Sequence, residues 1–233
     1  MLRHTIVLIK DLTAEVLEAM YQLMGDYYDN LRKDKFLKDL AEKEGVLLVY
    51  ESNGTLCGFT TYVIFETVFQ NEKINVLYSG DTVIREAYWG QASTAQIFMS
   101  LIQRFLSEPS VRFYWFLLSK GLRTYRLLPL YFKEYYPAPR GRTPDYEKNL
   151  IVHLCRLKFN SSYRESEGII RLNPPADRLK KKYLFVRENK LSDPTVPFFI
   201  KKNPGYIKGD ELPCVARISR DNLSQISRRW LKE

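Results

Sequence analysis

The sequence has little cysteine and little histidine, which excludes several kinds of site. Three cysteines, Cys57, Cys155 and Cys214, are far apart among 233 residues, and there are two histidines. No Cys-x-x-Cys pair is present, so we predict neither a disulfide framework nor a zinc site, and we expect no metal. A Gly-x-Ser-x-Gly element is also missing, which removes the usual sequence support for a hydrolase triad.

Long hydrophobic runs are missing as well. No apolar stretch approaches the length that crosses a bilayer, and the first residues contain no small-residue cleavage site. We therefore expect no membrane span and no signal peptide, and a reducing cytoplasm fits the cysteine usage. With 45% hydrophobic and 27% charged residues, the chain has enough apolar material for a globular core.

Basic residues outnumber acidic ones by 36 to 27, a formal net charge of +9. This charge attracts phosphates, anionic lipids and acidic proteins alike, so it does not select a partner. The one tight basic run, Arg178 with Lys180, Lys181 and Lys182, is more typical of an exposed helix face than of a nucleic-acid patch.

Hydrophobic periodicity predicts the element order β-α-α-β-β-β-α-β-α over the first 136 residues. The predicted strands are 5–10, 46–51, 55–69, 74–84 and 111–118, and the predicted helices are 13–24, 34–44, 94–106 (ended by 107–109) and 125–135. Asn53-Gly54 predicts a hairpin turn, and Thr13 is a good helix cap.

The rest of the chain is less regular. A helix from Thr143-Pro144-Asp145, a strand at 168–172, a helix at 176–188, a strand at 212–219 and a helix at 221–232 are predicted. The prolines between 137 and 144 favour a boundary there, which gives a first part, 1–140, and a C-terminal extension, 141–233.

Small and polar residues lie where the third hairpin strand runs into a helix. The stretch Tyr88-Trp89-Gly90-Gln91-Ala92-Ser93-Thr94 leaves backbone N–H groups that suit a pyrophosphate. Because Gly, Ser and Thr also begin ordinary helices, a purely structural cap is the alternative interpretation.

The element order together with this loop resembles the GNAT (Gcn5-related N-acetyltransferase) family. The resemblance implies a mixed α/β (α+β) fold, whose mostly antiparallel central sheet is flanked by helices, with an α/β extension. It also implies that the loop binds the pyrophosphate of acetyl-CoA. Gly90 is retained, while Ala92 and Thr94 replace glycines and Trp89 stands where a basic residue is common.

The expected cofactor-binding residues follow from that alignment and from two neighbouring positions. Ser119 falls where the family often has asparagine, and the guanidinium of Arg126 could clamp a cofactor phosphate. The expected set is Ile84, Trp89, Gly90, Gln91, Ala92, Ser93, Thr94, Ser119 and Arg126.

Two catalytic roles are implied. The stretch from Tyr131 to Tyr136 looks like the family's Tyr-x-x-x-Gly-Phe ending, although Tyr135 replaces the glycine, so the resemblance implies that Tyr131 protonates the departing thiolate. The alternative is that Tyr131 only packs.

A carboxylate on the central strands is the usual base in this fold. Glu66, Asp81 and Glu86 qualify by position, and each could also be a surface carboxylate. We choose Asp81 because it follows Ser79-Gly80, where a bulge could splay the sheet and open a cleft. In the extension, Tyr206, Asp210 and Glu211 either line an acceptor site or form a tight connection.

The sequence thus predicts an acyltransferase that moves an acetyl or longer acyl group from a thioester to an acceptor amine. The donor is acetyl-CoA, another acyl-CoA or an acyl carrier protein thioester, and the acceptor is a small molecule or a peptide. The alternatives are a catalytically inactive GNAT-like module that binds nucleic acid or an acidic protein, and an aminoacyl-transferring or acyl-homoserine-lactone-like enzyme.

Overall fold

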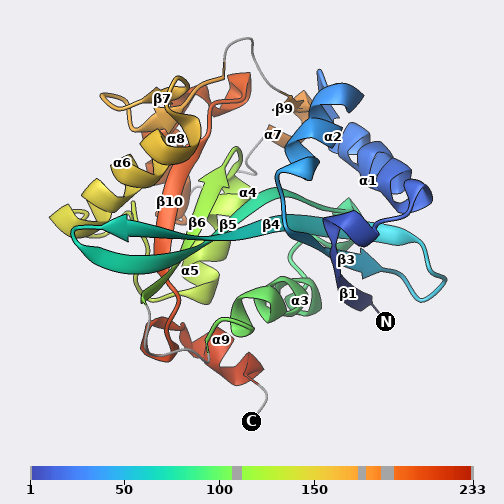
Figure 1. Cartoon of the computed structure of the whole chain (residues 1–233), viewed down its shortest axis with the longest axis horizontal. Helices are drawn as coiled ribbons and strands as arrows, with labels where there is room; N and C mark the ends of the chain where they lie inside the picture. Colours follow the sequence, from blue (N-terminus) through green and yellow to red (C-terminus); the bar gives the residue numbers. More distant parts are fainter. Residues whose placement is uncertain (1, 107–111, 173–176, 185–191, 232–233) are drawn as a thin grey trace.

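The computed structural model describes residues 2–106, 112–172, 177–184 and 192–231. Six strands form one sheet in the order β1-β3-β4-β5-β6-β10 (Figure 1). Neighbouring strands are antiparallel except for the parallel pair β5 and β6, so the predicted mixed, mostly antiparallel sheet is confirmed. The strands are β1 (Arg3–Leu8), β3 (Gly45–Tyr50), β4 (Leu56–Phe69), β5 (Glu72–Ile84), β6 (Arg112–Ser119) and β10 (Leu212–Arg217).

Helices cover both faces of this sheet. They are α1 (Ala14–Tyr27), α2 (Lys33–Ala41), α3 (Ala92–Gln103), α4 (Leu122–Tyr125), α5 (Leu127–Tyr131), α6 (Asp145–Phe159), α7 (Lys181–Leu184), α8 (Thr195–Lys202) and α9 (Gln225–Trp230). Short 3-10 turns are η1 (Ile9–Asp11), η2 (Glu86–Tyr88), η4 (Pro204–Lys208) and η5 (Arg220–Asn222), and the two-residue pairs are β2 (Tyr28–Asp29) with β9 (Arg178–Leu179) and β7 (Tyr163–Arg164) with β8 (Ile169–Ile170).

Alternate residues of the strands supply the core on each face. On one face, Val46 and Leu48 of β3 pack with α1 and α2, and Val76 of β5 packs with α6. On the other face, Leu47 and Leu77 pack with α3, α5 and α9. Figure 1 shows α1, α2 and α6 on one side of the long strands and α3 and α9 on the other. Successive side chains of a strand point to opposite faces, so each strand supplies both core layers.

Local chemistry sets several boundaries as the sequence predicts. The hydroxyl of Thr13 accepts a hydrogen bond from the Val16 amide and so caps α1. Gly54 has φ of 87°, which a tight turn between β3 and β4 needs. The strand β6 is buried along almost its whole length, as its continuous apolar run indicates.

Several predictions are wrong in detail. The terminal helix predicted at 221–232 begins only at Gln225, because residues 220–222 form the 3-10 turn η5. The helix at 125–135 is two short helices, α4 and α5, joined at Arg126, and Phe132 is already extended. The helix at 176–188 is wrong in its described part, because residues 178–179 form strand β9 against β2 and helix α7 covers only 181–184. Residues 107–109, and the ends of the predicted helices at 176, 185–188 and 232, lie outside the described residues.

The residues after 140 contribute to the same sheet as those before it. The strand β10 pairs with β6 in antiparallel register, and Phe199 and Cys214 are buried in one core cluster with residues of β3 and α3. The side-chain amide of Gln103 in α3 donates a hydrogen bond to the backbone carbonyl of Trp230 in α9. The boundary after residue 140 stays a prediction about chain organisation.

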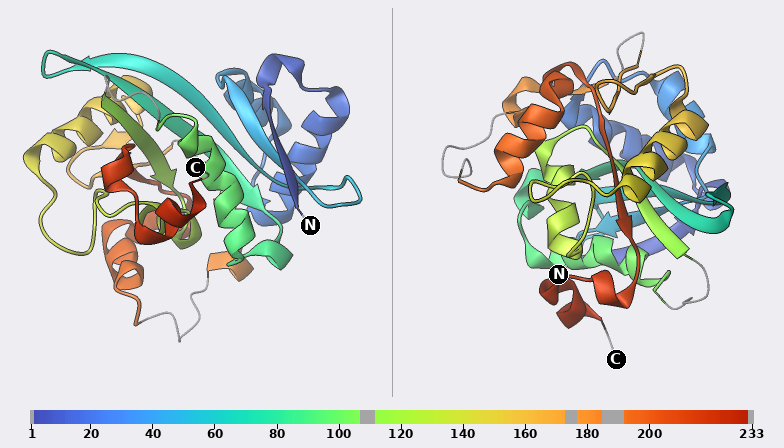
Figure 2. Two further views of the ribbon diagram at one scale, coloured as in Figure 1. Left: turned by 90° about the horizontal axis from the view of Figure 1, so that it is seen from below. Right: turned by 90° about the vertical axis from the view of Figure 1, so that its left-hand side faces the viewer.

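The long β4–β5 hairpin, whose strands can be followed in Figure 2, contains a bulge that decides where a site can form. Thr60 pairs with Thr82 and Tyr62 pairs with Ser79, so β5 has one extra residue at Gly80-Asp81 opposite Thr61. The pairing of β5 with β6 also ends at Ser79. In the described chain no strand pairs with Gly80–Ile84 on its β6 side, so the predicted bulge and divergence of the sheet are confirmed.

Candidate active site

A cavity of about 580 Å³ lies over the bulge, on the sheet face that carries α2 and α6. Its floor includes Tyr78, Gly80 and Asp81 of β5. Its walls include residues of α2 and, from the extension, the end of α6 and later residues such as Asp177 and Glu211. The extra residue in β5 explains why Gly80 and Asp81, although adjacent, both line it. The volume is typical of a small-molecule site.

Asp81 is the carboxylate at the bulge that the sequence analysis selected as the base. Burial raises the pKa of Asp81 to about 6, although the nearby Lys120 ammonium acts in the opposite direction. A carboxylate with this pKa is ionised at neutral pH yet holds a proton much more firmly than a solvated aspartate. Such a group suits proton abstraction near pH 7.

Gly80 leaves room for two other side chains. A Cβ at this position would lie 2.7 Å from Cε of Lys43 and 2.7 Å from Oγ1 of Thr61. Any larger residue would therefore displace the lysine stem or the bulge. The glycine thus brings the backbone of β5 close to Lys43, next to Asp81.

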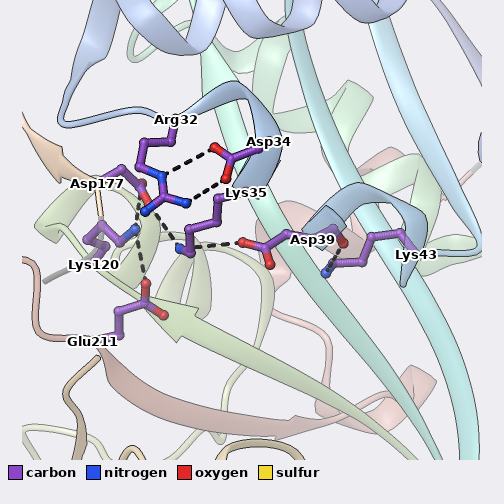
Figure 3. A network of polar contacts seen from close by, with 8 residues as sticks. All are labelled: Arg32, Asp34, Lys35, Asp39, Lys43, Lys120, Asp177 and Glu211. Atoms are coloured by element: carbon purple, nitrogen blue, oxygen red, sulfur yellow. Dashed lines mark hydrogen bonds and ion pairs between the residues drawn. The ribbon is translucent and has the colours of Figure 1, made fainter. Parts of the chain in front are cut away.

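A buried ion cluster closes one side of the cavity. Lys120 comes directly after β6. Its ammonium nitrogen lies 2.8 Å from a carboxylate oxygen of Asp177 and 3.1 Å from one of Glu211, both in the extension (Figure 3). Burial disfavours its charge, but Glu211 and Asp177 raise the pKa of Lys120 well above its ordinary value. Burial likewise opposes ionisation of Asp177, yet Lys120 and Lys35 keep the pKa of Asp177 below its usual range. The extension is therefore held to the sheet beside Asp81 by charge.

Two tyrosines complete the polar lining. Burial raises the pKa of Tyr28 and of Tyr78, so both phenols stay protonated at neutral pH. The ammonium of Lys120 lies 5.4 Å from the Tyr28 ring centroid, and that of Lys43 lies 5.4 Å from the Tyr78 ring centroid. Both rings can therefore stabilise cations in the cavity.

The mouth of α3 follows the diverging end of β5. Gly90 has φ of 76°, and a Cβ there would meet no described atom within 4 Å. No described side chain caps α3, and Ala95 is the first residue of the helix whose amide donates to a backbone carbonyl before it. Among the described residues, the amides of Ala92, Ser93 and Thr94 thus have no acceptor. These open donors fit a phosphate group.

Other donors of this loop are already used. Gln91 donates through its side chain to the Ala87 carbonyl, and the Thr94 hydroxyl donates to the Tyr88 carbonyl. The indole N–H of Trp89 donates to the Ile84 carbonyl, 2.8 Å away. The ring of Trp89 lies 3.5 Å from the Arg123 guanidinium carbon and 5.2 Å from the Tyr183 ring. These side chains stabilise the loop, so any phosphate contact would come from its backbone.

Two further expected cofactor residues lie in other surroundings. Ser119 is fully buried with its hydroxyl 4.0 Å from the Cys214 sulfur. Arg126 forms an ion pair with Asp193 of the extension at 3.1 Å. The structure therefore gives both residues contacts within the fold.

Tyr131 is packed in the core. It is 1% exposed, and its hydroxyl donates to the Ala95 carbonyl of α3 at 2.8 Å. Burial raises the pKa of Tyr131 well above that of a free tyrosine. It lines neither the cavity at the bulge nor the second cavity below. Its contacts join α5 to α3 and lend no support to the acid role that the resemblance implies.

The remaining carboxylates divide clearly. Glu66 is exposed and paired with Lys73 at 3.0 Å, and Glu86 is exposed in η2. In the extension, Asp210 binds the Arg171 guanidinium, whereas Glu211 lines the cavity. The structure thus brings Asp81 together with Glu211 and leaves Glu66 and Glu86 outside the cavity lining.

Tyr206, the third extension candidate, packs against Phe199 with ring centroids 5.6 Å apart. It does not line the cavity at the bulge.

Sequence reasoning missed Lys43, Lys120 and Asp177 as parts of this cavity. A signal existed for Lys120, because a lysine directly after a buried apolar strand lies at the sheet end where sites form. Nothing local distinguishes Lys43 or Asp177 from solvated charges.

A second cavity of about 490 Å³ lies at the other end of β6, lined by Arg112, Tyr114, Tyr146 and Arg217 among others. It contains none of the predicted site residues. Among the described residues, no three His, Cys, Asp or Glu side chains are placed to hold a metal ion. No described helix combines the length and hydropathy of a membrane span.

Comparison with known proteins gives a fold resemblance only. No family model and no curated protein matches the sequence. One similar solved structure is an Enterococcus faecalis protein of unknown function described as a probable N-acyltransferase, with 14% identity over 58% of this chain, 33% of that chain and a TM-score of 0.43. The match thus spans about a third of that protein's length.

Two other similar solved structures come from a bacterium and a plant. An Escherichia coli GNAT family N-acetyltransferase in complex with CoA shows 16% identity over 55% of this chain and 68% of that chain, with a TM-score of 0.39. Arabidopsis thaliana NAA60 with a bisubstrate analogue shows 12% identity over 54% of this chain and 81% of that chain, also with a TM-score of 0.39. The predicted resemblance to GNAT structures is confirmed, and at this level of similarity it carries no argument about activity.

Proposed function

We propose that this protein is an acyl-CoA-dependent acyltransferase, and that the cavity at the β5 bulge is where an acceptor amine is acylated. The observation that carries the proposal is the position of Asp81. It lies at the bulge, in a cavity, where β5 separates from β6, and burial raises its pKa to about 6. The thioester, when bound, supplies an activated acyl group.

The chain has groups that could bind the diphosphate of such a donor and groups that could contact its thioester carbonyl. The open amides at Ala92–Thr94 and the open space beside Gly90 fit a diphosphate. The unpaired side of β5 from Gly80 onward offers backbone donors that can polarise a carbonyl oxygen. Both features lie toward the carboxyl end of β5, and the proposal requires that one extended thioester spans them.

The proton balance rests on Asp81. As the acceptor nitrogen forms its bond to the acyl carbon and the carbon–sulfur bond breaks, the nitrogen must lose a proton, and the Asp81 carboxylate accepts it. Lys120 stays protonated in its ion cluster and preserves the ionised form of Asp81 at neutral pH. The sulfur leaves as a thiolate, and the proton that Asp81 accepts passes to solvent. Tyr28 and Tyr78 are protonated phenols in the same cavity that can each donate a hydrogen bond to this sulfur.

Binding of CoA can be tested by thermal denaturation. CoA at about 100 times its Kd should raise stability by about 2.7 kcal/mol, and the shift should be lost in Gly90→Trp, whose ring would cover the open amides of α3. Gly141→Trp is the matched control, since Gly141 has nearly the same φ, 75°, and equally open surroundings. It should lose similar intrinsic stability and keep the full CoA shift.

Equal CoA shifts in both variants, or no shift in the wild-type protein, would contradict the proposed donor site. The same experiment separates donors, because an acetyl group, a long acyl chain on CoA and an acyl carrier protein thioester are added in parallel. Stabilisation by nucleic acid in place of every thioester would favour the non-catalytic alternative.

A further inference from the structure

The lysines that line the cavity at the bulge differ in whether they form ion pairs with carboxylates of the fold. Lys35 is paired with Asp39 and Asp177, and Lys120 is paired with Asp177 and Glu211. Lys43 differs from both. Its ammonium donates to the Asp39 carbonyl oxygen and lies over the Tyr78 ring, and no described carboxylate lies within 4.0 Å of it.

Lys43 also has a defined position against the proposed base. Its Nζ lies 3.7 Å, and its Cε 2.7 Å, from the point where a Gly80 Cβ would stand, so the side chain runs along the bulge beside Asp81. The positive charge of Lys43 acts to lower the pKa of Asp81. A cation with spare donors and a base therefore occupy neighbouring positions in one cavity.

A third group at the same place is unsatisfied. Thr61 is 0% exposed, and its hydroxyl oxygen has no hydrogen-bond partner among the described residues. The Thr61 hydroxyl oxygen lies 2.7 Å from the point where a Gly80 Cβ would stand, the same point that Lys43 Cε approaches. A buried hydroxyl without a partner costs free energy, although Thr61 is not itself among the residues that line the cavity.

These groups define the acceptor chemically. We propose that the acceptor is a small amino acid-like molecule, whose carboxylate is bound by Lys43 and whose amine is presented to Asp81. This inference rests on the proposed function. An ammonium binds a carboxylate through charge-assisted hydrogen bonds, and the spare donors of Lys43 match a single carboxylate.

The test compares acceptors that differ only in the carboxylate. The twenty common amino acids and their carboxamides are offered with acetyl-CoA, and thiol release and product mass are measured. The best amino acid should exceed its carboxamide in kcat/KM by on the order of 10- to 100-fold. Lys43→Met should raise KM for that amino acid by a similar factor and so remove most of its advantage over its carboxamide. Because Lys43 also acts to lower the pKa of Asp81, any change in kcat should be common to both acceptors.

The controls keep folding and chemistry apart. Lys43→Arg retains the cation and should recover part of the affinity, and Lys38→Met, an exposed lysine of the same helix region, should behave as wild type. Equal use of amino acids and carboxamides, or an unchanged KM in Lys43→Met, would overturn the carboxylate assignment while transfer itself persists. No transfer to any amine, with no CoA shift, would instead overturn the proposed function and this inference with it.

Discussion

Replacing Asp81 with asparagine is expected to lower acyl-transfer kcat/KM by on the order of 10²- to 10⁴-fold, the usual contribution of a positioned general base. Asparagine keeps the size of the side chain but cannot accept the amine proton. In the wild-type protein kcat/KM should rise with pH through an apparent pKa near 6, because burial raises the pKa of Asp81 to about 6. The measurement is initial rates of thiol release from acetyl-CoA between pH 5 and 8.

The same substitution should stabilise the fold at high pH. Since the folded-state pKa of Asp81 lies above the value of 3.8 for a free aspartate, folding favours its protonated form. The favourable contribution is full below about pH 4 and is lost as the pH rises through about 6. The ionised carboxylate therefore costs the wild-type protein on the order of 3 kcal/mol at most at pH 8. Asp81→Asn should raise Tm at pH 8 and change it little at pH 4.

Glu66→Gln is the matched control for both effects. Glu66 is an exposed carboxylate on the neighbouring strand, paired with Lys73, so its neutralisation should change neither turnover nor the pH dependence of Tm. Full turnover in Asp81→Asn, or an equal loss in Glu66→Gln, would remove Asp81 from the mechanism.

Lys120→Met is expected to have the largest effect on stability. It removes the cation that lies between Asp177 and Glu211, and the side chains of all three residues are at most 14% exposed. Leaving buried carboxylates without their partner typically costs about 3–5 kcal/mol of unfolding free energy. The loss should be seen in urea denaturation at pH 7. Because Lys120 lowers the pKa of Asp177 in the folded protein, the loss should shrink as the pH falls through that lowered pKa and Asp177 becomes protonated.

Two comparisons make the Lys120 result specific. Lys73→Met breaks an exposed ion pair and should cost no more than about 1 kcal/mol. Lys120→Arg keeps the charge and should retain much of the stability.

Lys120→Met should also affect catalysis. Because Lys120 opposes the rise in the pKa of Asp81, the low-pH limb of kcat/KM should move to higher pH if the variant is folded. An unchanged midpoint in urea and an unchanged pH profile would show that the cluster neither holds the extension nor tunes the base.

The sheet could be predicted from the sequence because its information is local. The period-two strands, the Asn53-Gly54 turn and the Thr13 cap each specify their own element, and the structure has them where expected. The bulge was predictable for the same reason, since Ser79-Gly80-Asp81 interrupts a strand at a glycine. Asp81 could thus be selected before its surroundings were known.

The rest of the site depends on contacts between distant residues. Lys120 meets Asp177 and Glu211 across gaps of 57 and 91 positions, which no sequence window reports. The basic run after Arg178 has a helical pattern, yet Arg178 and Leu179 pair with β2, and the Lys180 ammonium donates to the Gly25 carbonyl. Tertiary contacts here outweigh helix propensity.

The surroundings of Tyr131 could not be predicted from its place in a sequence motif. Its place in the sequence agrees with the resemblance to a catalytic tyrosine, but the packing of α5 against α3 buries its ring and gives its hydroxyl to Ala95. Burial could not be read from a helix fragment in a chain with 16 tyrosines.

The most direct test of the acyltransferase assignment is a crystal structure with bound CoA. We expect the diphosphate on the open amides of Ala92–Thr94 and the thiol beside the unpaired edge of β5 at Gly80–Thr82, facing Asp81 across the cavity. CoA bound elsewhere on the chain, with the α3 mouth vacant and its thiol remote from the β5 bulge, would contradict the assignment.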